Sequence, residues 1–301
     1  MKIKSNDLEI EVEDTGGSGP PVLLIMGLGM QLIAWPQDFV QPLVDAGFRV
    51  IRHDNRDSGL SQHFDPFGVP NMLLAMTKVR FGFMPKPPYT LADMARDSIG
   101  VLDALGIDRA HVIGASMGGM IAQRVAIAAP ERLSSLTSIM SSSGAPGLPA
   151  PEADLIRAMF GEPKSAAPQD VFDYAEMLYR LIGSPAFPMT DADLRQRVVE
   201  AATRSFRPGG VPRQMLAIAA DTTRARELSN IRTPTLVLHG RADPLIPLAC
   251  GEDTARRIPG ARFVPIDGMG HDVAPGAVER LLPPIIEHLD AQWPASVREA
   301  A

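Results

Sequence analysis

Residues 110–130, AHVIGASMGGMIAQRVAIAAP, decide the expected fold of this 301-residue chain. The run begins as an apolar strand pattern over 110–114, turns through GASMG, and continues as a helical pattern over 117–129 that ends before Pro130. A serine on such a strand–turn–helix corner projects its hydroxyl, and glycines on both sides remove the Cβ atoms that would collide there. Free N–H groups at the helix start favour negative charge beside it. We therefore expect Ser116 to be a nucleophile.

A serine hydroxyl needs a general base. Of the six histidines, His271 lies in the glycine-rich loop GMGH that follows the last strand pattern, 262–266. A base that moves between serine and leaving group suits such a loop, so His271 is the expected base. His111 lies inside a strand pattern and is expected in the core. His53 and His239 end strand patterns, where they could support a neighbouring catalytic group.

The base needs a carboxylate to orient it, and Asp243 is the candidate. It follows the strand pattern 235–239, at the sheet edge expected for Ser116 and His271. The order Ser…Asp…His matches that of α/β-hydrolase sites. The competing position for the acid, after the strand pattern 133–139, reads MSSS and has no carboxylate.

Two backbone N–H groups are expected to stabilise an oxyanion. One belongs to Met117, directly after the nucleophile, and the other to Leu28, in the turn after the strand pattern 22–26. Gly27 and Gly29 allow the backbone to approach there. A dinucleotide-binding fingerprint is excluded, because Leu32 occupies the position of its third glycine.

Short apolar strand patterns alternate with longer helical patterns over most of the chain. This predicts an α/β fold, with a mostly parallel central sheet flanked by helices. The runs near Ile3 and 8–12 alternate polar and apolar residues and predict an antiparallel hairpin at one sheet edge. The strand patterns are 8–12, 22–26, 49–53, 110–114, 133–139, 235–239 and 262–266, and the helical patterns are 36–46, 91–105, 117–129, 251–258 and 278–289.

The alternation stops between Ser141 and Asn230. After the breaker cluster SSSGAPGLPAP come helical patterns, which Asp170 and Thr190 are expected to cap. We interpret residues 144–230 as a helical cap inserted into one α/β hydrolase core, formed by residues 1–143 and 231–301. A separate second domain is the alternative.

An irregular apolar segment covers residues 64–89. It is either an excursion packed against its own domain or a mobile flap at a substrate entrance. Because the cap and this segment both leave at the carboxyl ends of strands, we expect both to cover the side of the sheet that carries Ser116.

Composition excludes several classes of protein. A formal net charge of −6 gives no basic face for nucleic acid. A single cysteine, Cys250, rules out an internal disulfide framework and a cysteine-based zinc site. The chain begins without a signal-type apolar run, and no stretch is long and apolar enough to span a membrane. We expect a cytoplasmic enzyme without metal or cofactor, and leave open whether it is a monomer or a homodimer.

Five stretches in order, LLIMGLG, RHDNRDSGLSQ, HVIGASMGGMIAQ, TLVLHGRADPLIP and IDGMGHD, resemble the α/β-hydrolase fold family over nearly the whole chain. Met26 stands before the oxyanion turn where most members have histidine. That feature, with Trp35, Pro36 and HDNRDSG (53–59), is similar to the anthracycline (aclacinomycin-type) methylesterase branch. Asp54 and Arg56 are expected to brace the turn.

The resemblance implies a serine carboxylesterase that cleaves small-molecule esters through an acyl-enzyme on Ser116. Ser116 excludes the relatives that use an aspartate nucleophile. Enol-lactone hydrolysis, C–C bond hydrolysis and perhydrolysis share the triad and stay open, as does a non-catalytic ligand-binding role. We expect uncharged substrates with short to medium apolar groups. The expected cavity lining from the cap is Phe160, Met177, Leu181, Phe187 and Phe206.

Overall fold

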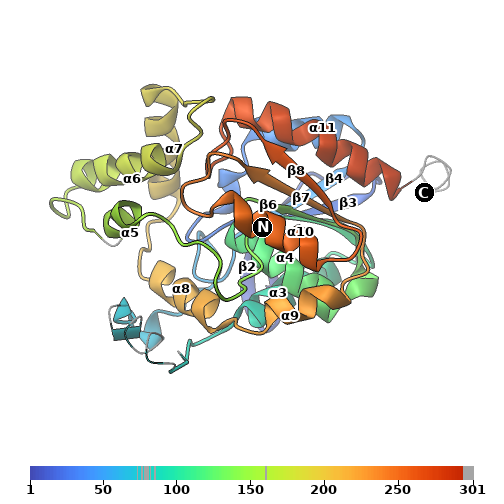
Figure 1. Ribbon diagram of the computed structural model, residues 1–301, viewed down its shortest axis with the longest axis horizontal. Helices are drawn as coiled ribbons and strands as arrows, with labels where there is room; N and C mark the ends of the chain where they lie inside the picture. Colours follow the sequence, from blue (N-terminus) through green and yellow to red (C-terminus); the bar gives the residue numbers. More distant parts are fainter. Residues whose placement is uncertain are drawn as a thin grey trace.

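An eight-stranded sheet runs through the centre of the molecule, in the order β1-β2-β4-β3-β5-β6-β7-β8 (Figure 1). The structure is a computed structural model and describes residues 1–72, 74, 75, 77, 81, 83, 84, 86–159 and 161–293. The strands are β1 Lys2–Ser5, β2 Leu8–Asp14, β3 Pro21–Ile25, β4 Arg49–His53, β5 Ala110–Ala115, β6 Leu133–Ile139, β7 Thr235–Gly240 and β8 Arg262–Ile266.

Strand direction follows the hydropathy of the strands. From β4 to β8 all neighbours pair in parallel, and β5, β6 and β7 are buried along their whole length. β1 and β2 form an antiparallel hairpin, and β2 joins β4 antiparallel. Their alternating polar and apolar residues suit an edge with one face toward solvent. The expected α/β fold with an edge hairpin is confirmed.

Helices cover both faces of the sheet. On one face, apolar side chains of α3 and α4 pack against the strands, as Met94 and Ile121 illustrate. On the other, α1 and α11 bury Phe39 and Leu281. These helices are α1 Gln37–Asp45, α3 Leu91–Ala104, α4 Met117–Ala128 and α11 Pro275–Ala291, and α10 Leu248–Arg257 packs beside β7 and β8. A short helix, α9 Arg224–Glu227, precedes β7.

In the described part of the chain, only helices lie between β6 and β7. They are α5 Ala153–Met159, α6 Pro168–Ile182, α7 Asp191–Arg204 and α8 Gly210–Ala220, followed by α9. In Figure 1, α5, α6 and α7 stand apart from the sheet, whereas α9 lies beneath it near α4 and α10. Thr190 caps α7 as expected, by accepting a hydrogen bond from the Asp193 N–H at 3.1 Å. Asp170 does not cap α6, because that helix already begins at Pro168.

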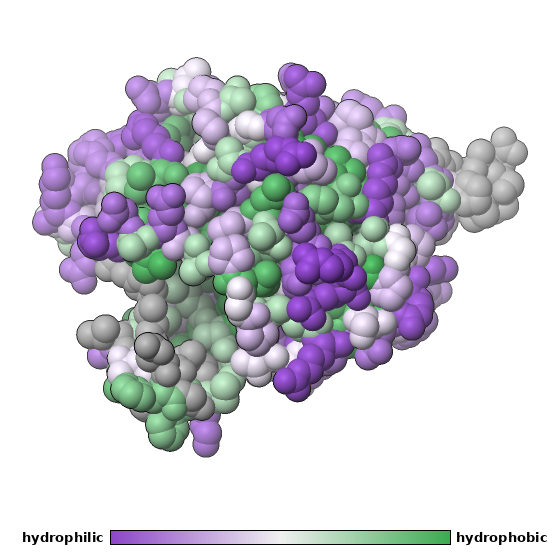
Figure 2. All heavy atoms as spheres, in the orientation of Figure 1, coloured by the Kyte–Doolittle hydropathy of each residue, from purple (hydrophilic) through white to green (hydrophobic). Residues whose placement is uncertain are grey.

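The first residues of the segment 64–89 pack on α8. Asp65 accepts a hydrogen bond from Arg213 at 3.0 Å, and the Gly68 carbonyl accepts another from it at 2.8 Å. Several apolar side chains stay exposed, and Figure 2 shows green residues gathered at this corner of the molecule. They include Phe67, Val69, Leu74, Phe81, Phe83 and Met84.

Candidate active site

Ser116 lies on a strained corner between β5 and α4. Its φ of 57° and ψ of −121° are rarely adopted by any residue other than glycine. A Cβ on Gly114 would lie 2.1 Å from the Gly118 carbonyl oxygen, and one on Gly118 would lie 2.0 Å from the Ile25 carbonyl oxygen. The corner closes only because these positions are glycine.

Three side chains predicted from the sequence meet in one chain of hydrogen bonds. The Ser116 hydroxyl is 2.9 Å from His271 Nε2, and His271 Nδ1 is 2.7 Å from Asp243 Oδ2. With Nδ1–H donating to the carboxylate, Nε2 is free to accept the hydroxyl proton. All three come from loops at the carboxyl ends of parallel strands β5, β7 and β8.

Asp243 is held as an ionised carboxylate. Its Oδ1 accepts hydrogen bonds from the N–H groups of Leu245 and Ile246, at 2.9 and 2.8 Å. Burial alone would raise its pKa, but the electrostatic interaction with His271 and the hydrogen bonds from His239 and His271 lower the pKa to about 2. The carboxylate therefore remains negative wherever it is needed to orient the imidazole.

His239 lies against Asp243, which agrees with the expectation that a histidine at this strand end could support a neighbouring group. It is fully buried, and its Nε2 lies 2.7 Å from the Ile246 carbonyl oxygen and 3.5 Å from Asp243 Oδ2. The other histidine at a strand end, His53, contacts Ser98 at 3.2 Å and stays away from the triad. His111 is buried against Ser135, as expected for the core.

The turn after β3 lies against Ser116. A Cβ on Gly27 would be 3.0 Å from Ser116 Cβ. The Leu28 N–H has no acceptor among the described residues, and the Met117 N–H is at the first position of α4, where helices leave N–H groups unpaired. Both expected oxyanion donors therefore border the serine with their N–H groups available.

The loop after β4 braces this turn, though only partly as expected. Asp54 accepts a hydrogen bond from the Leu32 N–H at 2.6 Å. Asn55, which the sequence had not singled out, donates to the Met26 carbonyl at 2.8 Å. The Arg56 side chain is directed elsewhere, into a buried ion pair with Asp97 of α3.

The His271 loop is held from the inserted helices. The His271 N–H donates to the Ile182 carbonyl at the end of α6, at 2.7 Å. Ser184 accepts a hydrogen bond from the Gly270 N–H at 2.9 Å and bonds the carboxylate of Asp272. His271 is thus held between β8 and the inserted segment.

A cavity of about 600 Å³ opens above Ser116 and His271. Its wall includes Met30, Leu178 and Ile182, together with the Tyr179 hydroxyl, which contacts Met30 Sδ at 3.5 Å. Burial raises the pKa of Tyr179 to about 12, so this hydroxyl is a neutral donor in the wall.

The expected lining residues are wrong, except for Phe160, which falls outside the described residues. Met177, Leu181, Phe187 and Phe206 are all absent from the described cavity wall. Leu181 and Phe206 are exposed, and Phe187 packs into the core beside α11. No described residue of 64–89 lines the cavity either.

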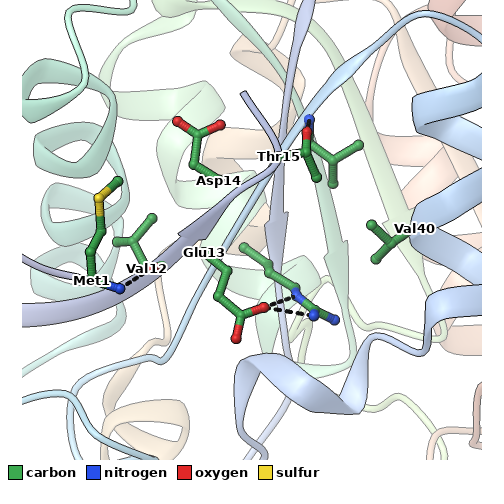
Figure 3. A pocket seen from close by; sticks show the side chains of 8 residues that line it. Met1, Val12, Glu13, Asp14, Thr15 and Val40 are labelled. Carbon is green, nitrogen blue, oxygen red and sulfur yellow. Dashed lines mark hydrogen bonds and ion pairs between the residues drawn. The ribbon is translucent and has the colours of Figure 1, made fainter. Parts of the chain in front are cut away.

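A second hollow, of about 410 Å³, lies between β2, β4 and α1 (Figure 3). Its charged side chains are paired, Glu13 with Arg52 and Asp14 with Arg49. It contains no nucleophile and is remote from Ser116 in the sheet order. This hollow offers no chemistry comparable with the Ser116 cavity.

One group of possible metal ligands, Asp57, His63 and Asp65, occurs in the described part of the chain. Both carboxylates already bind Arg213, at 2.7 and 3.0 Å. Their negative charge is therefore largely compensated by the protein itself.

Comparison with known proteins decides the family. A family model described as the alpha/beta hydrolase fold matches residues 20–275. The chain belongs to the alpha/beta hydrolase fold family. None of the helices described in this α/β hydrolase is long and apolar enough to cross a membrane.

Three relatives illustrate the range of this family. Rhodomycin D methylesterase DauP of Streptomyces sp. (strain C5) is 34% identical over 90% of this chain and 91% of its own. The 2-hydroxy-6-oxononadienedioate/2-hydroxy-6-oxononatrienedioate hydrolase of Cupriavidus pinatubonensis is 27% identical over 90% of this chain and 88% of its own. A meta-cleavage product hydrolase from Pseudomonas fluorescens IP01 superposes with a TM-score of 0.75 at 21% identity, covering 97% of both chains. The resemblance to methylesterases of this fold is confirmed.

Proposed function

We propose that this α/β hydrolase is a serine carboxylesterase that forms an acyl-enzyme on Ser116. The observation that carries the proposal is the continuous hydrogen-bonded chain from Ser116 through His271 to Asp243 at the floor of a large cavity. The methylesterase relatives support ester hydrolysis, and support an ester whose alcohol part is small.

Each group has a defined task in this mechanism. The Ser116 oxygen attacks the ester carbonyl while His271 Nε2 takes its proton, and Asp243 stabilises the resulting imidazolium. The N–H groups of Leu28 and Met117 bind the oxyanion of the tetrahedral intermediate. His271 then protonates the leaving alcohol, and water attacks the acyl-enzyme by the same steps in reverse.

We propose substrates that are uncharged near the ester. The cavity wall is mainly apolar, and its charged residues are four acids and one base, Arg197. Negative charge on a substrate would meet more repulsion than attraction there. The four acids are Asp38, Asp193, Glu200 and Asp272.

C–C bond hydrolysis is the second candidate, since relatives named as hydrolases of oxo-dienoate compounds match most of the chain. The acids on the cavity wall favour the esterase, because the dioate named for one relative is anionic. A panel of esters varied separately in acyl and alcohol parts, assayed beside a ring-cleavage-type dienoate, separates the two candidates.

The triad is tested by substitution, with a chromogenic short-chain ester as substrate. Ser116→Ala and His271→Ala are each expected to lower kcat by several orders of magnitude, whereas Asp243→Asn lowers kcat less because it disturbs orientation. Near wild-type turnover of a folded Ser116→Ala variant would contradict the proposal.

We also propose that residues 144–230 form the cap of one hydrolase core made of residues 1–143 and 231–301. Helices are the only regular elements described between β6 and β7, which supports this division. We place the enzyme in the cytoplasm, which suits its only cysteine, the buried and unpaired Cys250. Fractionation of the native host tests the location.

A further inference from the structure

We propose that Gln214, on the inserted helix α8, is a positioning residue that fixes the oxyanion turn. The proposal rests on the esterase mechanism above, in which the Leu28 N–H binds the oxyanion. On this proposal, the inserted segment helps to position a catalytic group as well as to line the cavity.

Gln214 uses both ends of its side chain and is fully buried. Its Oε1 accepts a hydrogen bond from the Gly29 N–H at 2.8 Å. Its Nε2 donates to the Arg56 carbonyl at 2.8 Å and to the Ser58 hydroxyl at 3.0 Å. The amide therefore ties the turn after β3 to the loop after β4, although it belongs to neither.

The contact with Gly29 acts on the peptide next to the proposed donor. The Gly27 carbonyl accepts a hydrogen bond from the Met30 N–H at 3.2 Å, and in a trans peptide the Leu28 N–H points the opposite way from that carbonyl. This bond orients the Gly27–Leu28 peptide, while Gln214 orients the Leu28–Gly29 peptide. With both planes held, the direction of the Leu28 N–H is set before substrate binds.

The shape of the turn makes a partner at this position necessary. Gly29 has a φ of +68°, and a Cβ there would lie 2.7 Å from Val211 Cγ2 of α8. The turn thus packs against α8, and the bond from its Gly29 N–H to Gln214 is partly buried. Without Gln214, the Gly29 N–H would lose its only acceptor among the described residues.

Donors aimed at the oxyanion contribute most when they need no reorganisation during the reaction. Removing a whole donor costs about 10²- to 10³-fold in kcat. Loss of Gln214 would only loosen the Leu28 N–H, through the neighbouring Leu28–Gly29 peptide. We therefore expect a smaller loss of kcat, of about ten- to fiftyfold. Ground-state binding of the ester depends little on this N–H, so KM should stay within about twofold of wild type.

The test compares Gln214→Met, which removes both polar ends at similar volume, with Gln214→Glu, which keeps an acceptor for the Gly29 N–H. We expect the methionine variant to lose kcat on the chromogenic ester. The glutamate variant should recover most of it, because burial favours the protonated carboxyl, which accepts from the Gly29 N–H and donates to the Arg56 carbonyl. Gln169→Met is the matched control, because it makes the same exchange at an exposed position of α6 that does not contact the turn, and its kcat should equal wild type. If Gln214→Met does not fold, Gln214→Asn replaces it, because its shorter side chain cannot span both contacts.

A second readout, hydrogen exchange of the Gly29 amide, does not depend on activity. Exchange should accelerate in Gln214→Met and remain slow in Gln214→Glu and Gln169→Met. Unchanged kcat in a folded Gln214→Met variant, or equal impairment of the glutamate variant, would overturn the proposal. A wild-type enzyme that cleaves no ester would instead refute the proposed esterase function. In that case, unchanged exchange of the Gly29 amide in Gln214→Met would still refute the proposal that Gln214 holds the turn.

Discussion

Asp243 illustrates how much one carboxylate depends on its partners. Its folded pKa of about 2 lies below the ordinary value of 3.8, so its ionisation stabilises the folded state above pH 4. That contribution is lost as the pH falls from about 4 to about 2, and a shift of this size corresponds to about 2 kcal/mol.

Asp243→Asn should therefore reduce the free energy of unfolding at pH 7 by up to about 2 kcal/mol, and by much less at pH 3. Urea unfolding followed by circular dichroism at the two pH values measures the difference. An equal loss at both values would show that the charge of Asp243 does not contribute to stability.

The meeting of Ser116, Asp243 and His271 could be predicted because each follows the end of a strand pattern. In a parallel sheet, those ends share one edge, so sequence order implies proximity in space. Gln214 gave no such signal. It is one polar residue in a helical pattern, 185 residues from Gly29, and only the packing of α8 determines that the two meet.

Helix α6 explains why the lining of the cavity was mispredicted. Its sequence has apolar residues on more than one face, so hydropathy cannot choose the face toward the cavity. Ala175, Leu178 and Ile182 line the wall, whereas Met177 and Leu181, one position away from two of them, do not. The face is chosen by the contact between Ile182 and the His271 loop, which connects segments distant in sequence.

Helix α8 approaches the core most closely at Gly210, where a Cβ would lie 2.2 Å from the Asp57 carbonyl oxygen. Gly210→Ala must push the helix away, so we expect a loss of about 1–3 kcal/mol in stability and a lower kcat. Gly209→Ala is the adjacent control, because its Cβ would be at ordinary contact distance, 3.4 Å, from Val69.

Thermal unfolding and ester turnover of both variants measure these effects. The control should be neutral or slightly stabilising, since alanine restricts the unfolded chain. Equal stability and turnover of the two variants would argue against close packing of α8 on the core at Gly210.

For the molecule as a whole, the fold class followed from the alternation of strand and helix patterns. The edge hairpin, the sheet and the break between β6 and β7 were all visible in the sequence. The docking of segment 64–89 was not, because it depends on Arg213 binding Asp57, Asp65 and the Gly68 carbonyl together. Ion pairs between distant irregular segments leave no periodic pattern.

Charge at the scale of the molecule predicts a salt effect. The net charge is −6, and acids outnumber bases on the cavity wall. We expect kcat/KM for an ester with a carboxylate in its acyl part to be low and to rise between 20 and 500 mM KCl, concentrations at which the screening length falls from about 20 to about 4 Å.

A neutral ester of the same length is the control, and its kcat/KM should change little over this range. Preference for the anionic ester at low salt would contradict the proposed substrate class. Loss of that preference in Arg197→Met would then identify the responsible cation.

The main-chain bond between Ile182 and His271 has a consequence for exchanging parts between related enzymes. A graft of residues 144–230 from a relative would replace the acceptor that seats the general base. The same graft would replace α8, which lies against the turn at Gly29. Such chimeras would therefore have two new contacts with the core, one at His271 and one at Gly29. The geometry of these two contacts would determine turnover even where the new cavity fits its substrate. Substitutions confined to the solvent-facing side of α5 and α7 would leave both contacts unchanged.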